Sequence, residues 1–453
     1  MTGSPAGGSV HRSARSTVRW GATATSCSPG TVPDVAGGAL ARRLGLGDAV
    51  LVGLGSMLGA GVFSVFGPAA RAAGGGLLLG LALAAAVAWC NAQSTARLAT
   101  RYPEAGGAYV YGRERLGPGW GHLAGWGFVV GKTASCAAVG LTFGTYAWPG
   151  HGRALAAAAV IAMTGATLAG IRRTALLNRG IVAVVAGSLA VAVAASWAGG
   201  QADAGRLLAG ATSPHGVLQA AGLLFFAFAG YARLATLGEE VVRPERTIPR
   251  AIPLALGLAL LTYLAVATAV LAVLGAMRLG RSPAPLQAAV ATGSWSWAGP
   301  VIRVGAVAAT LGVLLSLLLG VSRTALAMAR HGELPRLLAN VDASSASPRT
   351  ASVAVGVVVV SVVALADVRG AIGFSSTCVL AYYAVANASA WTLGGTRLQR
   401  TQAGAGLLGC LVLAANLPVR SLLAGVAVLA VGVLVRRVAG RRSPGGQAEG
   451  SGP

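Results

Sequence analysis

Apolar stretches of similar length recur along this chain from residue 46 onward. Each is close to the roughly 20 residues that an α-helix needs to cross about 30 Å of hydrocarbon. Because only 10% of the 453 residues are charged and 55% are hydrophobic, a water-soluble globule could not cover itself with polar side chains. The sequence predicts an all-α membrane protein with about twelve transmembrane helices, at residues 47-70, 75-97, 119-147, 153-171, 179-198, 216-238, 250-276, 299-329, 350-367, 371-394, 404-418 and 420-436.

Basic residues are concentrated in alternate loops between these stretches. The chain has 35 basic and 12 acidic residues, a formal net charge of +23. With the N terminus placed inside, 26 of the 34 arginines fall on cytoplasmic segments facing the lipid bilayer's anionic inner leaflet, as the positive-inside rule requires. No basic patch is joined to stacking aromatic residues, which argues against nucleic acid as a partner. We expect a multi-pass protein of the bacterial plasma membrane with both termini cytoplasmic, a flexible basic arm at 1-45 and a flexible tail at 438-453.

Two of the apolar stretches contain features that weaken a helix. The first has glycines at positions 53, 55, 59 and 61, near the expected bilayer middle, and each costs about 1 kcal/mol relative to alanine in a helix interior. The sixth has Gly230 within the aromatic run Phe225–Tyr231. Close helix packing through small residues would explain the first pattern. Helices unwound at matching positions of two halves would instead indicate the substrate site of a transporter.

Four motifs follow one another in order along the chain: Gly55–Phe63; Tyr102–Tyr111 with Leu116–Pro118; Phe225–Tyr231 with Gly238–Arg250; and Ser322–Pro335. They resemble the amino acid-polyamine-organocation (APC) superfamily, close to bacterial amino acid permeases and cationic amino acid transporter-like members. The resemblance covers residues 46 to about 395. It implies a LeuT-type five-plus-five inverted repeat, with halves at 46-200 and 214-395, broken helices 1 and 6, and two peripheral helices within 402-437.

The same resemblance implies a substrate site at the two broken helices. The substrate α-carboxylate would lie against backbone N–H groups of Ala60 and Gly61. The α-ammonium would meet carbonyl oxygens of Met57, Phe226 and Ala229. Ala60 departs from the Ser or Thr that many relatives carry, and Ser56 is the nearest substitute hydroxyl. The candidate substrate-binding residues are Ser56, Met57, Gly59, Ala60, Gly61, Gly131, Lys132, Cys136, Phe226, Ala229 and Gly230.

Lys132 is the only lysine of the chain and lies inside the third apolar stretch. A cation near the bilayer centre costs at least about 2.5 kcal/mol, so it should face a cavity or a partner. A lysine that snorkels to the surface is the alternative, but each end of the helix lies about 24 Å away along the axis. We expect Lys132 either to exchange a coupling proton or to offset negative charge on the substrate.

Glu239 and Glu240 are the acids nearest the membrane at the inner end of the sixth stretch. They are expected to form an ion-paired junction with neighbouring arginines, and a cytoplasmic gate is the alternative. The five cysteines and five histidines are scattered without the spacing of metal ligands. The sequence therefore predicts neither a metal site nor a cofactor.

These observations favour a secondary active transporter that moves amino acids or related amines by alternating access, coupled to protons or to exchange. An intramembrane enzyme would need a buried nucleophile, base or metal ligands, and no such group of residues is evident. A channel or structural membrane protein would not need two matched broken helices. The expected partners are a small-molecule substrate, the lipid bilayer and protons.

Overall fold

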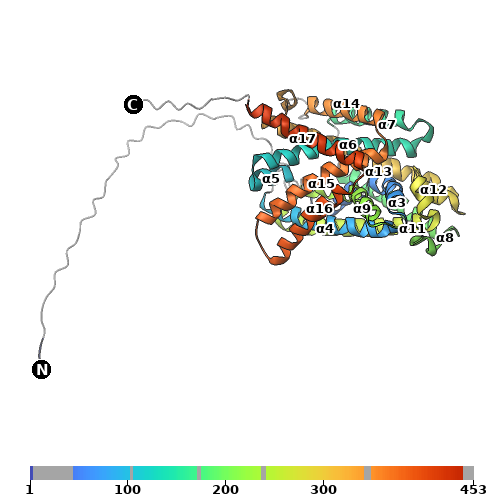
Figure 1. Ribbon diagram of the computed structural model, residues 1–453, viewed down its shortest axis with the longest axis horizontal. Helices are drawn as coiled ribbons and strands as arrows, with labels where there is room; N and C mark the ends of the chain where they lie inside the picture. Colours follow the sequence, from blue (N-terminus) through green and yellow to red (C-terminus); the bar gives the residue numbers. More distant parts are fainter. Residues whose placement is uncertain (4–43, 103–105, 171–174, 236–240, 341–347, 442–453) are drawn as a thin grey trace. The chain divides into compact units, whose positions relative to one another are not determined.

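The computed structural model describes residues 1–3, 44–102, 106–170, 175–235, 241–340 and 348–441. The chain divides into two units, Met1–Ala39 and Leu40–Pro453, and every described helix belongs to the second. Within the described residues this second unit is helical, apart from an isolated bridge between Leu44 and Val241 (Figure 1). The predicted all-α class is confirmed. The predicted arm at 1-45 and tail at 438-453 lie for the most part outside the described residues.

The helices alternate between long membrane-sized segments and short connecting turns. Up to Ala198 they are α1 (Leu46–Met57), α2 (Ala60–Ser64), α3 (Phe66–Ala73), η1 (Gly74–Gly76), α4 (Leu77–Arg101), α5 (Ala108–Leu116), α6 (Pro118–Ala147), η2 (Pro149–His151), α7 (Gly152–Leu168) and α8 (Ala175–Ala198). Beyond it they are η3 (Ala204–Leu207), α9 (Pro214–Phe228), η4 (Ala229–Tyr231), α10 (Ala232–Ala235), α11 (Pro244–Arg281), α12 (Pro285–Thr292), η5 (Ser296–Ala298), α13 (Gly299–Arg330), η6 (Arg336–Ala339), α14 (Arg349–Leu365), α15 (Val368–Thr392), α16 (Arg397–Ala415) and α17 (Val419–Arg441).

All twelve predicted apolar stretches form helices, but they are not equal as membrane spans. In the described part of the chain, nine segments are long and apolar enough to cross a bilayer, and they match the predicted stretches other than the fourth, ninth and eleventh. Those three form α7, α14 and α16, of 17, 17 and 19 residues. The exposed apolar side chains of α16 and α17, such as Leu411 and Leu423, suit contact with lipid tails. The chain is a multi-pass membrane protein.

Local sequence explains where α16 begins and where it ends. The eleventh stretch was predicted to begin at residue 404, but α16 begins at Arg397. Thr396 and Gln399 form a capping box there, in which each side chain accepts a hydrogen bond from the other residue's backbone N–H. The predicted break before the twelfth stretch is confirmed, because α16 ends at Ala415 and α17 begins after Pro418.

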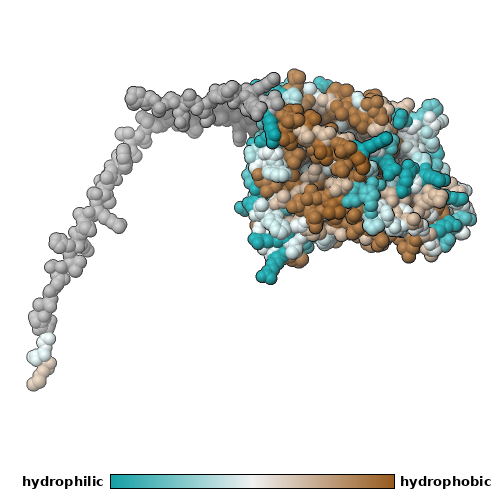
Figure 2. Space-filling model, viewed as in Figure 1, coloured by the Kyte–Doolittle hydropathy of each residue, from teal (hydrophilic) through white to brown (hydrophobic). Residues whose placement is uncertain are grey.

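Helices α6 and α15 lie at the centre of the bundle. They pack against each other, and α6 also packs against α13. In both α6 and α15, 78% of the apolar span is buried, against 17% for α17. Figure 2 shows apolar residues over much of the viewed face of this unit. The central position of α6 explains how its single lysine can lie away from lipid.

Two helices of the bundle are interrupted. The first apolar stretch divides into α1 and α2, with Leu58 and Gly59 between them. The sixth passes from α9 into the 3₁₀ turn η4 and then into the short α10. The predicted interruptions at matching stretches are therefore present.

Candidate functional site

The two interruptions touch each other backbone to backbone. A Cβ atom added to Gly230 in η4 would lie 2.3 Å from the carbonyl oxygen of Ser56 in α1. One added to Gly61 in α2 would lie 2.7 Å from the Cα atom of Ala227 in α9. Neither backbone atom can move aside as a flexible side chain could. Glycine is required at both positions because the other helix occupies the space of a side chain.

A tyrosine of α11 joins the two interruptions. The Tyr263 hydroxyl lies 2.6 Å from the Met57 carbonyl oxygen and 2.9 Å from that of Ala227, and its one proton is shared between them. Its side chain is buried and its ring packs edge-to-face against Phe228. One phenol therefore satisfies a carbonyl at the end of α1 and another near the end of α9, where helical partners are missing.

The ammonium of Lys132 reaches the same region from α6. Its Nζ atom donates to the Ala229 carbonyl oxygen at 3.4 Å, and the side chain is 7% exposed. The Tyr383 hydroxyl of α15 donates to the same oxygen at 3.3 Å. Among the described residues, the recorded ion pairs do not include Lys132. A buried cation therefore lies against a neutral carbonyl at the second interruption.

A cavity of about 210 Å³ lies where the interruptions meet α6, α13 and α15. Nine of the eleven predicted substrate-binding residues line it: Ser56, Met57, Gly59, Ala60, Gly61, Lys132, Phe226, Ala229 and Gly230. Gly131 and Cys136 are not among the lining residues. A Cβ atom on Gly131 would lie 2.8 Å from Cys378 Cβ, so this glycine faces α15, and Cys136 is fully buried in an apolar cluster.

The cavity wall also contains residues that the sequence analysis did not single out. Arg233 of α10, Arg323 of α13 and Tyr109 of α5 line it, together with Val313 and Tyr382. A tyrosine or valine within an apolar stretch carries no signal that it faces a cavity instead of lipid. The arginines were counted as loop charges, although the basic excess at the inner ends of helices could have indicated a charged vestibule.

The predicted hydroxyl of Ser56 is directed away from a ligand. Its Oγ atom donates to the Val52 carbonyl oxygen at 2.9 Å, four residues earlier in the same helix. Ser316 and Thr324 of α13 make the same type of bond, to Gly312 and Gly320. Hydroxyls in membrane helices commonly satisfy their own backbone in this way. The protons of these three lining hydroxyls are therefore directed to carbonyls of their own helices.

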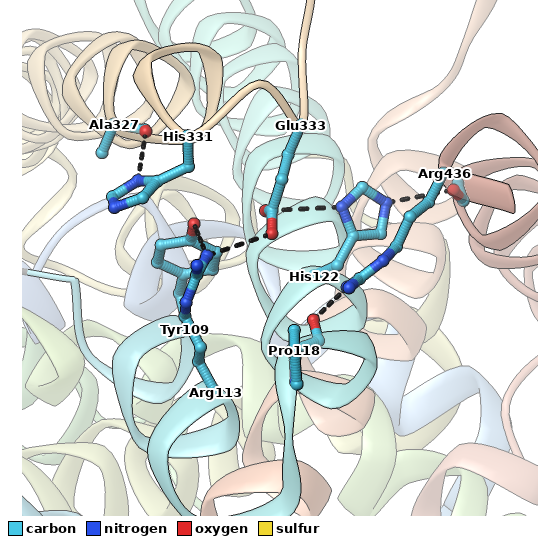
Figure 3. A network of polar contacts seen from close by, with 9 residues as sticks. Tyr109, Arg113, Pro118, His122, Ala327, His331, Glu333 and Arg436 are labelled. Atoms are coloured by element: carbon cyan, nitrogen blue, oxygen red, sulfur yellow. Dashed lines mark hydrogen bonds and ion pairs between the residues drawn. The ribbon is translucent and has the colours of Figure 1, made fainter. Parts of the chain in front are cut away.

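A polar junction lies beside the cavity, between α5, α6, α17 and the turn after α13 (Figure 3). Its centre is Glu333, whose carboxylate lies 3.5 Å from Arg113 Nη1 and 3.4 Å from His122 Nδ1. The buried His122 ring contacts the Gly432 carbonyl oxygen with Nε2 at 3.0 Å, and Arg436 donates to the Pro118 carbonyl. The junction ties helices distant in sequence to the end of α13.

Tyr109 connects this junction to the cavity, because it lines the cavity and its hydroxyl accepts a hydrogen bond from Arg113 at 3.4 Å. Burial, with a contribution from the Glu333 carboxylate, raises the pKa of Tyr109 to about 12. The phenol therefore stays protonated at neutral pH. Glu239 and Glu240, which were expected to form a separate ion-paired junction at the inner end of the sixth stretch, lie outside the described residues.

The family profile and the relatives found by sequence comparison are named as permeases or transporters. The sequence profile described as amino acid permease matches residues 48–401. A protein of Mycobacterium tuberculosis named as an uncharacterized transporter is 58% identical over 421 residues, which is 92% of this chain and 95% of the relative. The vacuolar cationic amino acid transporter 2 of Arabidopsis thaliana is 31% identical over 74% of this chain and 57% of its own. The branched-chain amino acid permease of Bacillus subtilis is 26% identical over 69% of this chain and 72% of its own.

Proposed function

The chain belongs to the amino acid permease family, and we propose that it moves an amino acid or related amine across the bacterial plasma membrane by alternating access. The observation that carries this proposal is the meeting of two interrupted helices at a cavity in the middle of the bundle. Interrupted helices free backbone groups as ligands for a polar cargo at membrane depth. The names of two relatives, a cationic amino acid transporter and a branched-chain amino acid permease, support an amino acid as the cargo.

We propose that the helices form two inverted five-helix repeats, 46-200 and 214-395, followed by two peripheral helices within 402-437. The interruption in the first helix of each half supports this division. In this arrangement α7, α14 and α16 are the three shorter crossings. With twelve crossings both termini lie on one side, and the arginine distribution supports the cytoplasm as that side.

The substrate in this proposal replaces contacts that the protein now makes with itself. Its α-carboxylate lies against Ala60 and Gly61, and its α-ammonium reaches the carbonyl oxygens of Met57, Phe226 and Ala229. Because Lys132 and Tyr383 already donate to Ala229, a substrate ammonium arriving there displaces the lysine. A displaced Lys132 can give up a proton or take a new anionic partner. Substrate binding is thereby coupled to the charge of Lys132.

The test is uptake and counterflow in proteoliposomes with a panel of amino acids, with and without an imposed proton or sodium gradient. We expect saturable uptake that a competing amino acid inhibits and that an inward proton gradient, but not sodium, accelerates. Lys132→Met should lose the acceleration, whereas Arg303→Gln should keep it, because exposed Arg303 is not among the residues that line the cavity.

Saturable, competitive uptake would separate a transporter from an intramembrane enzyme or a structural membrane protein. If no amine-bearing solute accumulates or exchanges, the proposal is wrong. Uptake by Lys132→Met that keeps the full response to protons would remove the coupling role alone.

A further inference from the structure

We propose that the cavity selects an amino acid whose side chain carries a carboxylate, so that the transported species has a net negative charge. This inference rests on the proposed function and names the substrate class of the same site. It is argued from the charges of the cavity wall, from the direction of its hydroxyl protons, and from the contacts of Lys132.

Among the described residues, the charged groups that line the cavity have one sign. Lys132, Arg233 and Arg323 line the cavity, and the described lining residues include no Asp or Glu. A guanidinium remains protonated throughout the physiological range, so two of the three charges do not depend on the state of Lys132. A cavity lined by one sign of charge between apolar walls raises the local concentration of the opposite charge. Lys132 and Arg323 therefore favour a substrate with an excess of negative charge and oppose a cationic side chain.

The three cations lie at different depths of the same cavity. Lys132 is buried at the second interruption, Arg233 is half-buried in α10, and Arg323 is exposed on α13. An anion that enters past Arg323 thus meets one cation along its route and a second, Lys132, at the site. A substrate with a cationic side chain would be repelled at both of these positions.

Three of the lining hydroxyls do not compete with these cations as hydrogen-bond donors to a carboxylate. Ser56, Ser316 and Thr324 direct their protons to carbonyls of their own helices. A neutral side-chain amide could bind through weaker contacts, but it would bring no charge opposite to that of Lys132. Charge-assisted hydrogen bonds are roughly twice as strong as neutral ones, so a carboxylate gains more from this wall than an amide of the same shape.

The contacts of Lys132 indicate where the side-chain carboxylate of the substrate would bind. Among the described residues the Lys132 ammonium donates to the carbonyl oxygen of Ala229, to which the Tyr383 hydroxyl also donates. When the substrate ammonium takes that carbonyl, Lys132 loses its acceptor while it remains buried. A buried cation needs an anionic partner. A second carboxylate on the substrate supplies this partner, and an uncharged or cationic side chain does not.

The experiment compares glutamate with glutamine, which has almost the same shape and lacks the charge. In counterflow with the full-length protein in proteoliposomes, we expect L-glutamate to compete at least about tenfold better than L-glutamine, since a hydrogen bond to a charged group contributes about 1.5 to 3 kcal/mol. L-Leucine and L-arginine should compete more weakly than L-glutamate. The thermal stability of the detergent-solubilised protein should rise with L-glutamate more than with L-glutamine.

Variants separate the role of charge from general damage to the fold. Lys132→Met should bring the glutamate-to-glutamine preference close to one, and Lys132→Arg should retain a preference for glutamate. Arg323→Gln should raise KM for glutamate more than for glutamine with little change in kcat, whereas the matched change Arg303→Gln on the same helix should alter neither. If Lys132→Met does not fold, the Arg323→Gln comparison decides the question.

The possible failures are distinguishable. Transport of leucine, glutamine or arginine that glutamate does not inhibit would overturn the acidic-substrate inference and leave the permease function standing. An unchanged glutamate preference in both Lys132→Met and Arg323→Gln would overturn the assignment of specificity to these cations. Absence of transport and of thermal stabilisation with every amino acid tested would overturn both proposals.

Discussion

Individual residues explain why the two interruptions lie in contact. Gly61 and Gly230 each occupy a position where a side chain would enter the backbone of the other interrupted helix. The run of glycines in the first stretch predicted a weak helix, and both the packing and the unwinding interpretations hold, because the weak point is also a close contact. Tyr263 could not be predicted, since a tyrosine in an apolar helix has no sequence signal for the two distant carbonyls that it joins.

We predict that Gly230→Ala destabilises the protein. The added methyl group would lie 2.3 Å from the Ser56 carbonyl oxygen, so the two helices would have to separate. Overpacking of this kind costs about 1 to 3 kcal/mol, and occasionally more. The measurement is the thermal unfolding midpoint and the uptake rate. Gly257→Ala is the control, because nothing lies within 4 Å of its added methyl group and alanine is favoured over glycine in α11. Equal stability of the two variants would contradict the close-contact explanation.

Tyr263→Phe tests the hydrogen bonds between the interruptions. The change leaves two buried carbonyl oxygens without this donor, at a cost of about 1 to 3 kcal/mol, and we expect slower transport as well as a lower unfolding midpoint. Tyr111→Phe is a matched control, because Tyr111 is equally buried and its hydroxyl has no hydrogen-bond partner among the described residues. If Tyr263→Phe loses no more stability than Tyr111→Phe, the contacts of the Tyr263 hydroxyl with the two carbonyls are dispensable.

At the scale of helices, apolar length located the elements, and local capping decided their ends. The start of α16 was missed because the Thr396–Gln399 capping box extends the helix into a polar segment that hydrophobicity does not mark. Lys132, Gly131 and Cys136 were all selected from the third apolar stretch, but Lys132 lines the cavity, whereas Gly131 faces α15 and Cys136 is buried in an apolar cluster. Spacing along one helix predicts a shared region, but the neighbouring helices decide which side chains reach the cavity.

The junction around Glu333 gives a prediction about how elements move together. Glu333→Gln removes the ion pair with Arg113 and the charge beside His122, so we expect a lower maximal transport rate with an unchanged KM. A double-mutant cycle with Arg113→Met should give a coupling energy of about 0.5 to 3 kcal/mol, towards the lower end because Arg113 is 38% exposed. Glu114→Gln is the control, because Glu114 is an exposed acid next to Arg113 in α5. Additive effects of the two changes would show that the ion pair does not link α5 to the end of α13.

At the scale of the whole molecule, composition and charge predicted a multi-pass helical protein, and the structure and relatives confirm that class. The membrane topology remains a prediction from the arginines. Reporter fusions test it: a periplasmic phosphatase should be active after Gly150, between α6 and α7, and a cytoplasmic fluorescent protein should fold after Gly395 and after Arg441. Phosphatase activity at Arg441 would place the C terminus outside and contradict the arrangement. The sequence predicted twelve crossings from apolar stretches, but α7 and α14 have only 17 residues each and fall short of a standard span.

The close packing of the two interruptions at Gly61 and at Gly230 also limits how a protein of this kind can acquire a new cargo. A substitution at either glycine changes the distance between the interrupted helices before it changes the shape of the cavity. New specificity is therefore expected to arise on the surrounding walls of the cavity, to which Lys132 contributes. In the proposed function the interrupted helices bind the backbone of the amino acid, and the surrounding walls are the part that evolution or protein engineering can change.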